Sequence, residues 1–209
     1  TFYGALASYS VVASKTNIGV GETGTLTVSG LDANGKAATL GTVNATSGTT
    51  TVATVTATDT SGVITVTGVA AGTAVITLAN ATSSATVTAT HDLTIVAAGI
   101  SSVALSFDKT SYAPGEKATI TVTAKNADGA LAGDQAYANL FTTAGITSSA
   151  SLNGYTADAS VTTTSGLKTY TVYMPLAGGP VTISAILGAS VAAAIQDTTV
   201  TTATEVEAD

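Results

Sequence analysis

The sequence predicts an all-β protein of two similar β-sandwich domains in tandem, and two observations carry this prediction. The first is an internal repeat: residues 16–36 align without a gap on residues 110–130, so that Glu22 falls on Glu116, 94 residues later. The second is a regular alternation of apolar and hydroxyl-bearing side chains inside each copy. A repeat of this length in a chain of 209 residues indicates two domains, each near the ~100 residues that a β-sandwich commonly has.

The alternation places a strand in the middle of each copy. In the second copy, the apolar side chains of Ile120 and Val122 alternate with threonines; in the first copy, Leu26 and Val28 do the same. A period of two puts one set of side chains on each face of a β-strand. Threonine is β-branched and favours the extended backbone even on a solvent-facing surface. We therefore expect half-buried strands at both places.

Turn-forming residues bound each of these strands. Gly-Glu precedes the strand in both copies, and Pro114 fixes the backbone angle φ just before it in the second copy. An Asx-Ala-Asx-Gly segment follows at residues 32–35 and at residues 126–129. Glycine supplies a positive φ there, and the Asn or Asp side chain can bond nearby backbone groups. A strand between two such turns is typical of an antiparallel sheet.

Two further segments resemble a known family. Residues 51–57 read Thr-Val-Ala-Thr-Val-Thr-Ala, and residues 62–77 contain Gly-Val-Ala-Ala-Gly-Thr-Ala-Val-Ile-Thr. Over roughly residues 14–97 the chain resembles the bacterial Ig-like domain of group 2, the invasin/intimin-like kind, except that the tryptophan common in that family is missing. The second half resembles bacterial Ig-like surface domains in general, through residues 111–116 and the turn that follows its strand.

The resemblance implies an all-β fold of two tandem Ig-like β-sandwich domains, and the apolar residues at the start of the chain indicate an extended N-terminal arm before them. The predicted boundaries are 1–13 for the arm, 14–98 for the first domain, 99–200 for the second, and 201–209 for an acidic tail or linker. Two interpretations of the arm stay open: it is the first strand of the first domain, or it pairs with the sheet edge of a neighbouring subunit.

Composition excludes several classes of protein. The net charge is −7, only 9% of residues are charged, and all six basic residues are lysine, so nucleic-acid binding is not expected. The chain has no apolar run near the ~20 residues of a membrane span. It has no cysteine, which removes disulfides and zinc–thiolate sites. It begins at Thr1 and its one methionine is Met174, so either a leader was removed or the chain is an excised fragment; with this composition we expect removal of an export signal.

The sequence offers no catalytic constellation. The one histidine, His91, is followed directly by Asp92. Neighbouring residues on a strand face opposite sides, so this pair does not have the geometry of a catalytic triad. The sequence also lacks a lysine-bearing phosphate loop. We therefore predict no enzyme, and no catalytic, cofactor-binding or metal-binding residues.

Calcium is the one ion that stays a candidate, because several loop residues carry oxygen ligands. These residues are Asp32, Asn34, Glu116, Asp128, Asp134 and Asp158. The dense Asp-x-Asp-x-Asp spacing of a calcium loop is missing, and the simpler interpretation is that these residues form turns. Two glycosylation sequons are also present, at Asn44 and at Asn80.

These features predict an extracellular, cell-surface structural protein. Ig-like modules with few charges favour self-assembly into a surface-layer lattice or a filament, with other copies of the chain as partners and a cell-envelope glycan as a further candidate. The alternative is a binding module, an adhesin or a phage virion domain that recognises a cell-surface glycan or protein. If the aromatic residues of the second domain cluster at an exposed site, the binding module is favoured; if they are buried, they belong to the core. The aromatic residues concerned are Tyr137, Phe141, Tyr155, Tyr170 and Tyr173.

Overall fold

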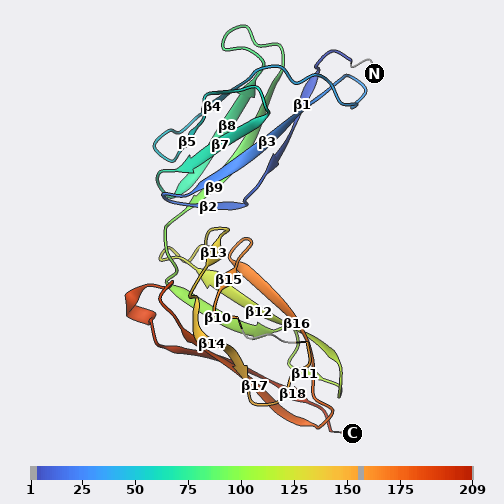
Figure 1. Ribbon diagram of the computed structural model, residues 1–209, viewed down its shortest axis with the longest axis vertical. Coiled ribbons are helices and arrows are strands. Elements are labelled where there is room, and N and C mark those ends of the chain that lie inside the picture. The colour runs from blue at the N-terminus through green and yellow to red at the C-terminus, as the bar shows by residue number, and fades with distance from the viewer. Residues whose placement is uncertain (1–3, 155–157, 209) are drawn as a thin grey trace. The chain divides into compact units, whose positions relative to one another are not determined.

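The computed structural model describes residues 4–154 and 158–208, and it confirms the predicted all-β fold class (Figure 1). The described residues form strands joined by turns, with one short 3-10 turn at Ala193–Ile195 and no α-helix. The chain divides into two compact units, residues 1–98 and residues 99–209. No helix of the described residues is long and apolar enough to cross a membrane.

The first unit is a sandwich of two sheets. The first sheet has the strand order β1 (Ser8–Ala13), β3 (Thr23–Leu31), β7 (Val63–Gly68), β5 (Ala53–Val55). The second has the order β2 (Asn17–Gly19), β9 (Thr88–Val96), β8 (Gly72–Ala79), β4 (Val43–Ser47), β6 (Thr58–Asp59). All pairs are antiparallel except β2 with β9, which run parallel. The chain therefore leaves the first sheet after β1 and enters the second at β2.

The second unit repeats this plan. Its first sheet has the order β10 (Ser102–Phe107), β12 (Lys117–Lys125), β16 (Leu167–Tyr173). Its second has the order β11 (Ser111–Tyr112), β18 (Thr199–Val206), β17 (Gly179–Leu187), β14 (Phe141–Ser148), and β13 (Ala136–Tyr137) pairs separately with β15 (Val161–Thr162). The short strand β11 runs parallel to the last strand, as β2 does in the first unit. Two facing sheets with this crossing are the Ig-like arrangement.

The strand β1 is the equivalent of β10 in every register position. Ser8 pairs with Leu31 in the first unit, and Ser102 pairs with Lys125 in the second, both exactly one repeat of 94 residues apart. Of the two interpretations left open for the arm, residues 8–13 follow the first, because they pair with β3 of their own unit. Residues 1–3 of the predicted arm lie outside the described residues.

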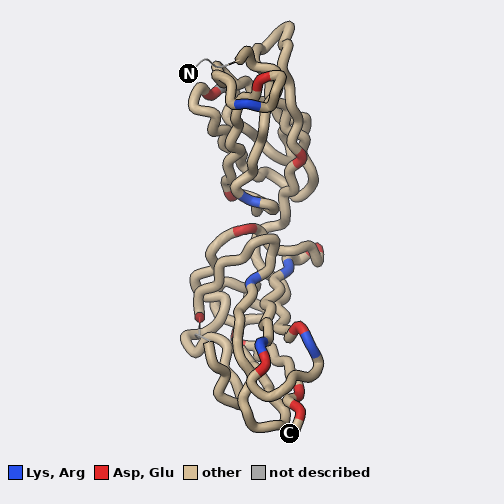
Figure 2. The backbone as a smooth tube through the Cα atoms, turned by 90° about the vertical axis from the view of Figure 1, so that its right-hand side faces the viewer, with Lys and Arg blue, Asp and Glu red and all other residues tan. Residues whose placement is uncertain are grey.

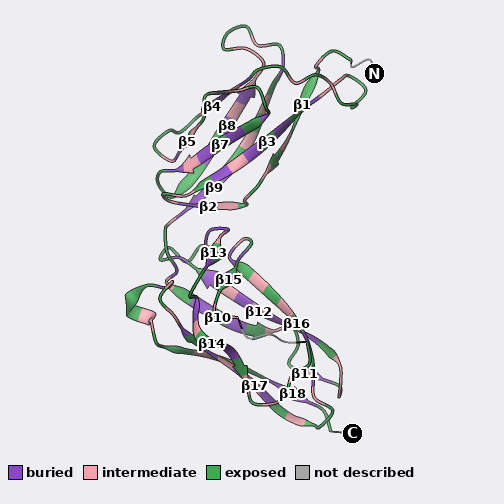
Figure 3. Cartoon of the chain, viewed as in Figure 1, coloured by how far each residue is buried: buried purple, intermediate pink, exposed green. Residues whose placement is uncertain are grey.

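Each unit encloses its own apolar core, built from the inward-facing half of each alternating strand (Figure 3). Leu26 and Val28 of β3 are buried, and so are the equivalent Ile120 and Val122 of β12. The intervening threonines face outward, as the period of two predicts. The alternation in the sequence thus directly sets which side chains form the core.

The prediction of an acidic tail or linker at 201–209 is wrong, because residues up to Val206 belong to β18. This strand pairs with β17 from Thr199 to Val206 and with β11 at its end. Glu205 lies on the exposed face, while Val206 on the inward face is 1% exposed. The acidic residues occupy the solvent side of an alternating strand, so their charge does not indicate disorder here.

This correction predicts that the end of the chain is required for folding of the second unit. Truncation after Val200 removes most of β18, and we expect the second unit to lose its cooperative unfolding transition in circular dichroism. Truncation after Val206 is the matched control and should leave that transition in place. Equal melting curves for the two truncations would show that β18 contributes nothing to the fold.

Candidate functional site

The outer face of the first sheet of unit 1 carries no charge. None of the strands β1, β3, β7 and β5 contains a charged residue. Figure 2 shows how sparse the charges are along the whole chain. The outward side chains on β1, β3 and β7 are those of Ser8, Ser10, Val12, Thr23, Thr25, Thr27, Ser29, Leu31, Val63, Thr65 and Thr67. We call this surface the hydroxyl face.

An apolar row crosses the hydroxyl face. The register places Val12 opposite Thr27, and Thr27 opposite Val63. Val12 is 64% exposed and Val63 is 41% exposed. Methyl groups in such a row gain free energy when another surface covers them, and the neighbouring hydroxyls lose far less on burial than charges would. The hydroxyl face is therefore suited to contact with an uncharged surface.

The residues that make the repeat visible in the sequence hold the crossing between the sheets. Lys15 Nζ lies 3.2 Å from Glu22 Oε2, and Lys109 forms the same ion pair with Glu116. Just before the lysine, the Ser14 hydroxyl accepts a hydrogen bond from the Thr25 backbone N–H at 2.8 Å. Asp108 and Thr119 form the equivalent bond in unit 2. These charges are already paired, so their role is structural.

The repeated Asx turns are also satisfied internally. Asp32 Oδ1 accepts the backbone N–H groups of Asn34 at 2.8 Å and Lys36 at 2.9 Å. Asn126 Oδ1 accepts the equivalent pair of N–H groups. The glycines at 35 and 129 have φ of 72° and 77°, which a residue with a side chain rarely adopts. These residues form turns, as their spacing predicts.

The calcium candidates do not converge. Glu116 also accepts the Ala113 backbone N–H, and Asp134 accepts the backbone N–H of Ser165. Within residues 4–154 and 158–208, no group of three or more His, Asp or Glu residues could hold a metal ion. Asp158, which is half-buried shortly before β15, belongs to no such group. Calcium binding therefore stays a prediction without a located site.

Tyr112 forms a polar network that the sequence analysis did not predict. Its hydroxyl donates to Asp108 Oδ1 at 2.7 Å and accepts the Lys109 backbone N–H at 2.9 Å. The side chain is 1% exposed and packs edge-on against Phe107. Burial, and then the hydrogen bond to Asp108, raise the pKa of Tyr112 to about 12. The network closes the crossing from β10 to β11.

The hydroxyl of Tyr9, in contrast to that of Tyr112, is not hydrogen-bonded to any described residue. Its oxygen atom is buried. Burial raises the pKa of Tyr9 above its ordinary value. The equivalent position in unit 2 holds Val103, an apolar residue. Unit 1 therefore carries a hydroxyl where the repeated fold needs none.

The aromatic group of unit 2 is divided between core and surface. Tyr137 and Phe141 are 6% and 0% exposed, and Tyr170 packs against the same core. Tyr173 is 46% exposed, and Tyr155 lies outside the described residues. The core interpretation holds for Tyr137 and Phe141, and these two residues cannot line an exposed binding site.

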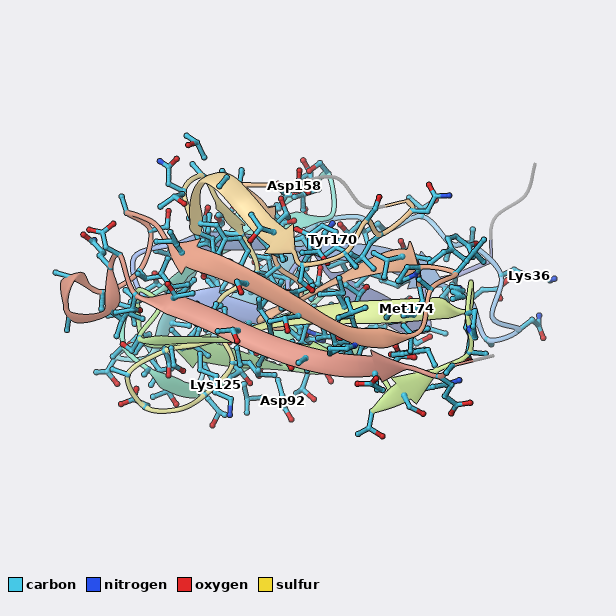
Figure 4. The ribbon with its side chains drawn as sticks, turned by 90° about the horizontal axis from the view of Figure 1, so that it is seen from below. Lys36, Asp92, Lys125, Asp158, Tyr170 and Met174 are labelled. Atoms are coloured by element: carbon cyan, nitrogen blue, oxygen red, sulfur yellow. The ribbon has the colours of Figure 1, made fainter. Side chains whose placement is uncertain are left out.

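His91 and Asp92 face opposite sides of β9. His91 pairs with the buried Ile76, whereas Asp92 pairs with Val75, which is 44% exposed. Asp92 points away from the ribbon in Figure 4. His91 lies within β9, in the second sheet of unit 1. His91 and Asp92 therefore do not have the geometry of a catalytic triad, as their adjacency in the sequence indicates.

The two sequon asparagines differ in what their side chains do. Asn80 closes the loop between β8 and β9: its Nδ2 donates to Thr86 Oγ1 at 3.0 Å, and its Oδ1 accepts two backbone N–H groups. A sugar on Asn80 would compete with the Nδ2 bond. Asn44 lies half-buried on β4, opposite Ala79. Glycosylation stays a prediction at both positions.

No family model and no curated protein matches this sequence. Among solved structures, the chain is similar to the Escherichia coli adhesin FdeC, with a TM-score of 0.41 and 21% identity over 94% of this chain. It is similar to domains 4–9 of the surface layer protein SbsC, with a TM-score of 0.39 and 22% identity over 98%. It is also similar to the Yersinia pseudotuberculosis adhesin InvE, with a TM-score of 0.36 and 19% identity over 97%.

The chain spans 65% of the FdeC chain, 32% of the SbsC fragment and 60% of the InvE chain. These neighbours are two bacterial adhesins and a surface layer protein. The Ig-like assignment itself depends on the strand order and register of this chain.

The two tyrosine hydroxyls should respond oppositely to removal. Tyr112→Phe breaks two hydrogen bonds, one of them to the carboxylate of Asp108, so we expect a loss of about 1–2 kcal/mol in the free energy of unfolding. Tyr9→Phe removes a buried hydroxyl without a described partner, so the free energy should stay constant or rise by up to about 1 kcal/mol. Urea denaturation of both variants measures the contrast; equal losses would refute it.

The same network predicts an alkaline sensitivity. Tyr112 has a folded-state pKa of about 12, against 10.0 ordinarily, so the unfolded chain releases this proton first as pH rises. Between pH 10 and about 12 the folded state therefore binds more protons, and stability falls with rising pH. The stability difference between wild type and Tyr112→Phe should shrink across this range. A difference that is constant from neutral pH to pH 12 would contradict the assignment.

Proposed function

We propose that this chain is part of an exported cell-surface protein whose Ig-like units bind one another, as a structural subunit of a lattice or filament. One observation carries the proposal: the first sheet of unit 1 presents a hydroxyl face and an edge strand that are both free of charge. A surface of this kind can contact an identical surface without opposing like charges.

The distribution of charge supports self-association. The chain carries a net charge of −7, which would repel copies if it were spread over every face. In unit 1 the charges lie at turns and on the second sheet, for example Lys36 in a loop and Asp92 on β9 (Figure 4). The hydroxyl face is therefore the part of unit 1 where two copies meet at the lowest electrostatic cost.

The binding-module alternative has no observation in its favour among the described residues. It would require aromatic side chains grouped at an exposed site, and two of the four described members of the aromatic group are buried in the core of unit 2. Recognition of a cell-envelope glycan by another part of a longer protein would be compatible with self-assembly through unit 1.

The proposal predicts ordered assemblies of the purified chain. We expect sheets or filaments in electron micrographs, and a molar mass that rises with concentration in light scattering. The association should change little with ionic strength, because the contact surface is uncharged. Assemblies that dissociate when a chelator is added would show that calcium takes part in the association. A monodisperse single chain at every concentration, with and without calcium, would refute the proposed function.

A charge placed on the contact surface should weaken the assembly. Val63→Lys puts an ammonium group in the apolar row of the hydroxyl face, and we expect the concentration needed for assembly to rise at least tenfold, or about 1.4 kcal/mol. Thr46→Lys is the matched control, because Thr46 is exposed on β4 in the other sheet. Equal effects of the two variants would show that net charge, and not the hydroxyl face, controls association.

A further inference from the structure

The strand β1 has an open side. In an antiparallel pair, alternate residues direct their backbone N–H and C=O groups toward the partner strand. Just after β1, Ser14 donates its N–H to the Thr25 carbonyl at 2.9 Å. In this register the even-numbered residues of β1 likewise direct their backbone N–H and C=O groups toward β3. Tyr9, Val11 and Ala13 direct their backbone groups the other way. No described strand is hydrogen-bonded to that side, because β1 is the last strand of its sheet.

The equivalent strand β10 also ends its sheet, but its inward side chains are better covered than those of β1. In unit 2 the equivalents of Tyr9 and Val11 are Val103 and Leu105, which are 8% and 7% exposed. There β10 lies alongside β18, whose Thr202 and Ala203 line a shared groove of about 600 Å³.

In unit 1, β1 approaches β9 over a shorter stretch, and Tyr9, Val11 and Ala13 are only half-buried. The apolar side chains that unit 2 covers with its own last strand stay partly uncovered in unit 1.

The edge also lacks the features that keep sheet edges apart. Residues 4–14 contain no proline and no charged residue. The nearest charge, Lys15, is engaged by Glu22. Edges are normally protected by lysines, prolines, bulges or a covering segment, whereas residues 8–13 pair regularly with β3. The register shifts only before the strand, where the Ala7 N–H bonds the Leu31 carbonyl at 2.8 Å. An exposed, regular and uncharged edge is a template for another strand.

We propose that β1 pairs antiparallel with β1 of a second copy of this chain, about a two-fold axis at Val11; this inference rests on the proposed function. In this register Val11 faces its own counterpart, and Tyr9 faces Ala13, a large residue against a small one. All three residues with open backbone groups are then hydrogen-bonded. Lys15 falls opposite Ala7, so no like charges oppose each other. Two four-stranded sheets become one continuous sheet, and the hydroxyl faces of both copies join.

The absence of cysteine makes the pairing directly testable. In the proposed register Ser10 lies opposite Val12 of the second copy, as a pair that is not hydrogen-bonded. The Cα atoms of such pairs lie about 4.5 Å apart, within the range that a disulfide bridges. Both side chains are exposed. An equal mixture of Ser10→Cys and Val12→Cys should therefore oxidise to a covalent dimer several-fold faster than either variant alone.

The second unit supplies the matched control. Ala104 and Ser106 are the repeat equivalents of Ser10 and Val12, and both are exposed. A mixture of Ala104→Cys and Ser106→Cys should not form the dimer above the rate of each variant alone, because β18 lies beside β10. Equal cross-linking of the two mixtures would overturn the inference, since it would reflect random collision.

A proline variant separates the inference from the proposed function. Val11→Pro removes an N–H that faces away from β3, so the intramolecular ladder stays intact. Because the Val11 side chain also packs against the core, Val11→Ala is the matched control for the change in melting temperature. We expect Val11→Pro to lose the β1–β1 contact. If wild type assembles but the mixture of Ser10→Cys and Val12→Cys does not cross-link, or if Val11→Pro assembles as wild type does, the inference is overturned and the proposed function survives. If copies of the chain do not associate at all, both the β1–β1 pairing and the proposed function are refuted.

Discussion

The backbone register between the first strand and the central strand of each sandwich is the constraint on which the rest of the structure depends. β1 on β3 and β10 on β12 share one register, and each strand ends at the same crossing to the second sheet. The crossing is held by a side chain that accepts a central-strand N–H, Ser14 in one unit and Asp108 in the other. Because side chains alternate along a strand, this register decides which residues enter the core and which face solvent.

The same constraint explains why the two units differ at their edges. Both first strands end their sheets, but the last strand of unit 2 lies close enough to cover the edge of β10. The polar network of Tyr112 closes that crossing, whereas Ile18 occupies the equivalent place in unit 1 with apolar contacts alone. The unit with the less covered edge is also the unit whose first sheet carries no charge. We infer that one unit is built mainly to fold and the other to fold and to meet a partner.

Much of the fold could be predicted from the sequence, because the alternation in β3 and β12 and the turns that bound them are local signals. The equivalence of β1 and β10 was also within reach: continuing the repeat backwards places Tyr9 on Val103 and Val11 on Leu105. The strand at residues 199–206 was missed because Glu205 and Glu207 suggested a solvated tail, and only pairing with β17 reveals that Glu205 lies on an exposed face. The open edge of β1 could not be predicted, because it depends on how near a strand distant in sequence comes to it.

Hydrogen–deuterium exchange, compared between assembled and dissociated protein, tests the central claim most directly. If copies associate through the first sheet of unit 1, the amides of Tyr9, Val11 and Ala13 exchange rapidly in the single chain and become protected on assembly. The amides of Val103 and Leu105, on the equivalent edge of β10, should exchange at the same rate in both states, because this edge takes no part in the proposed contact. Protection that appears in unit 2 alone, or assembly without any protection of β1, would contradict the account.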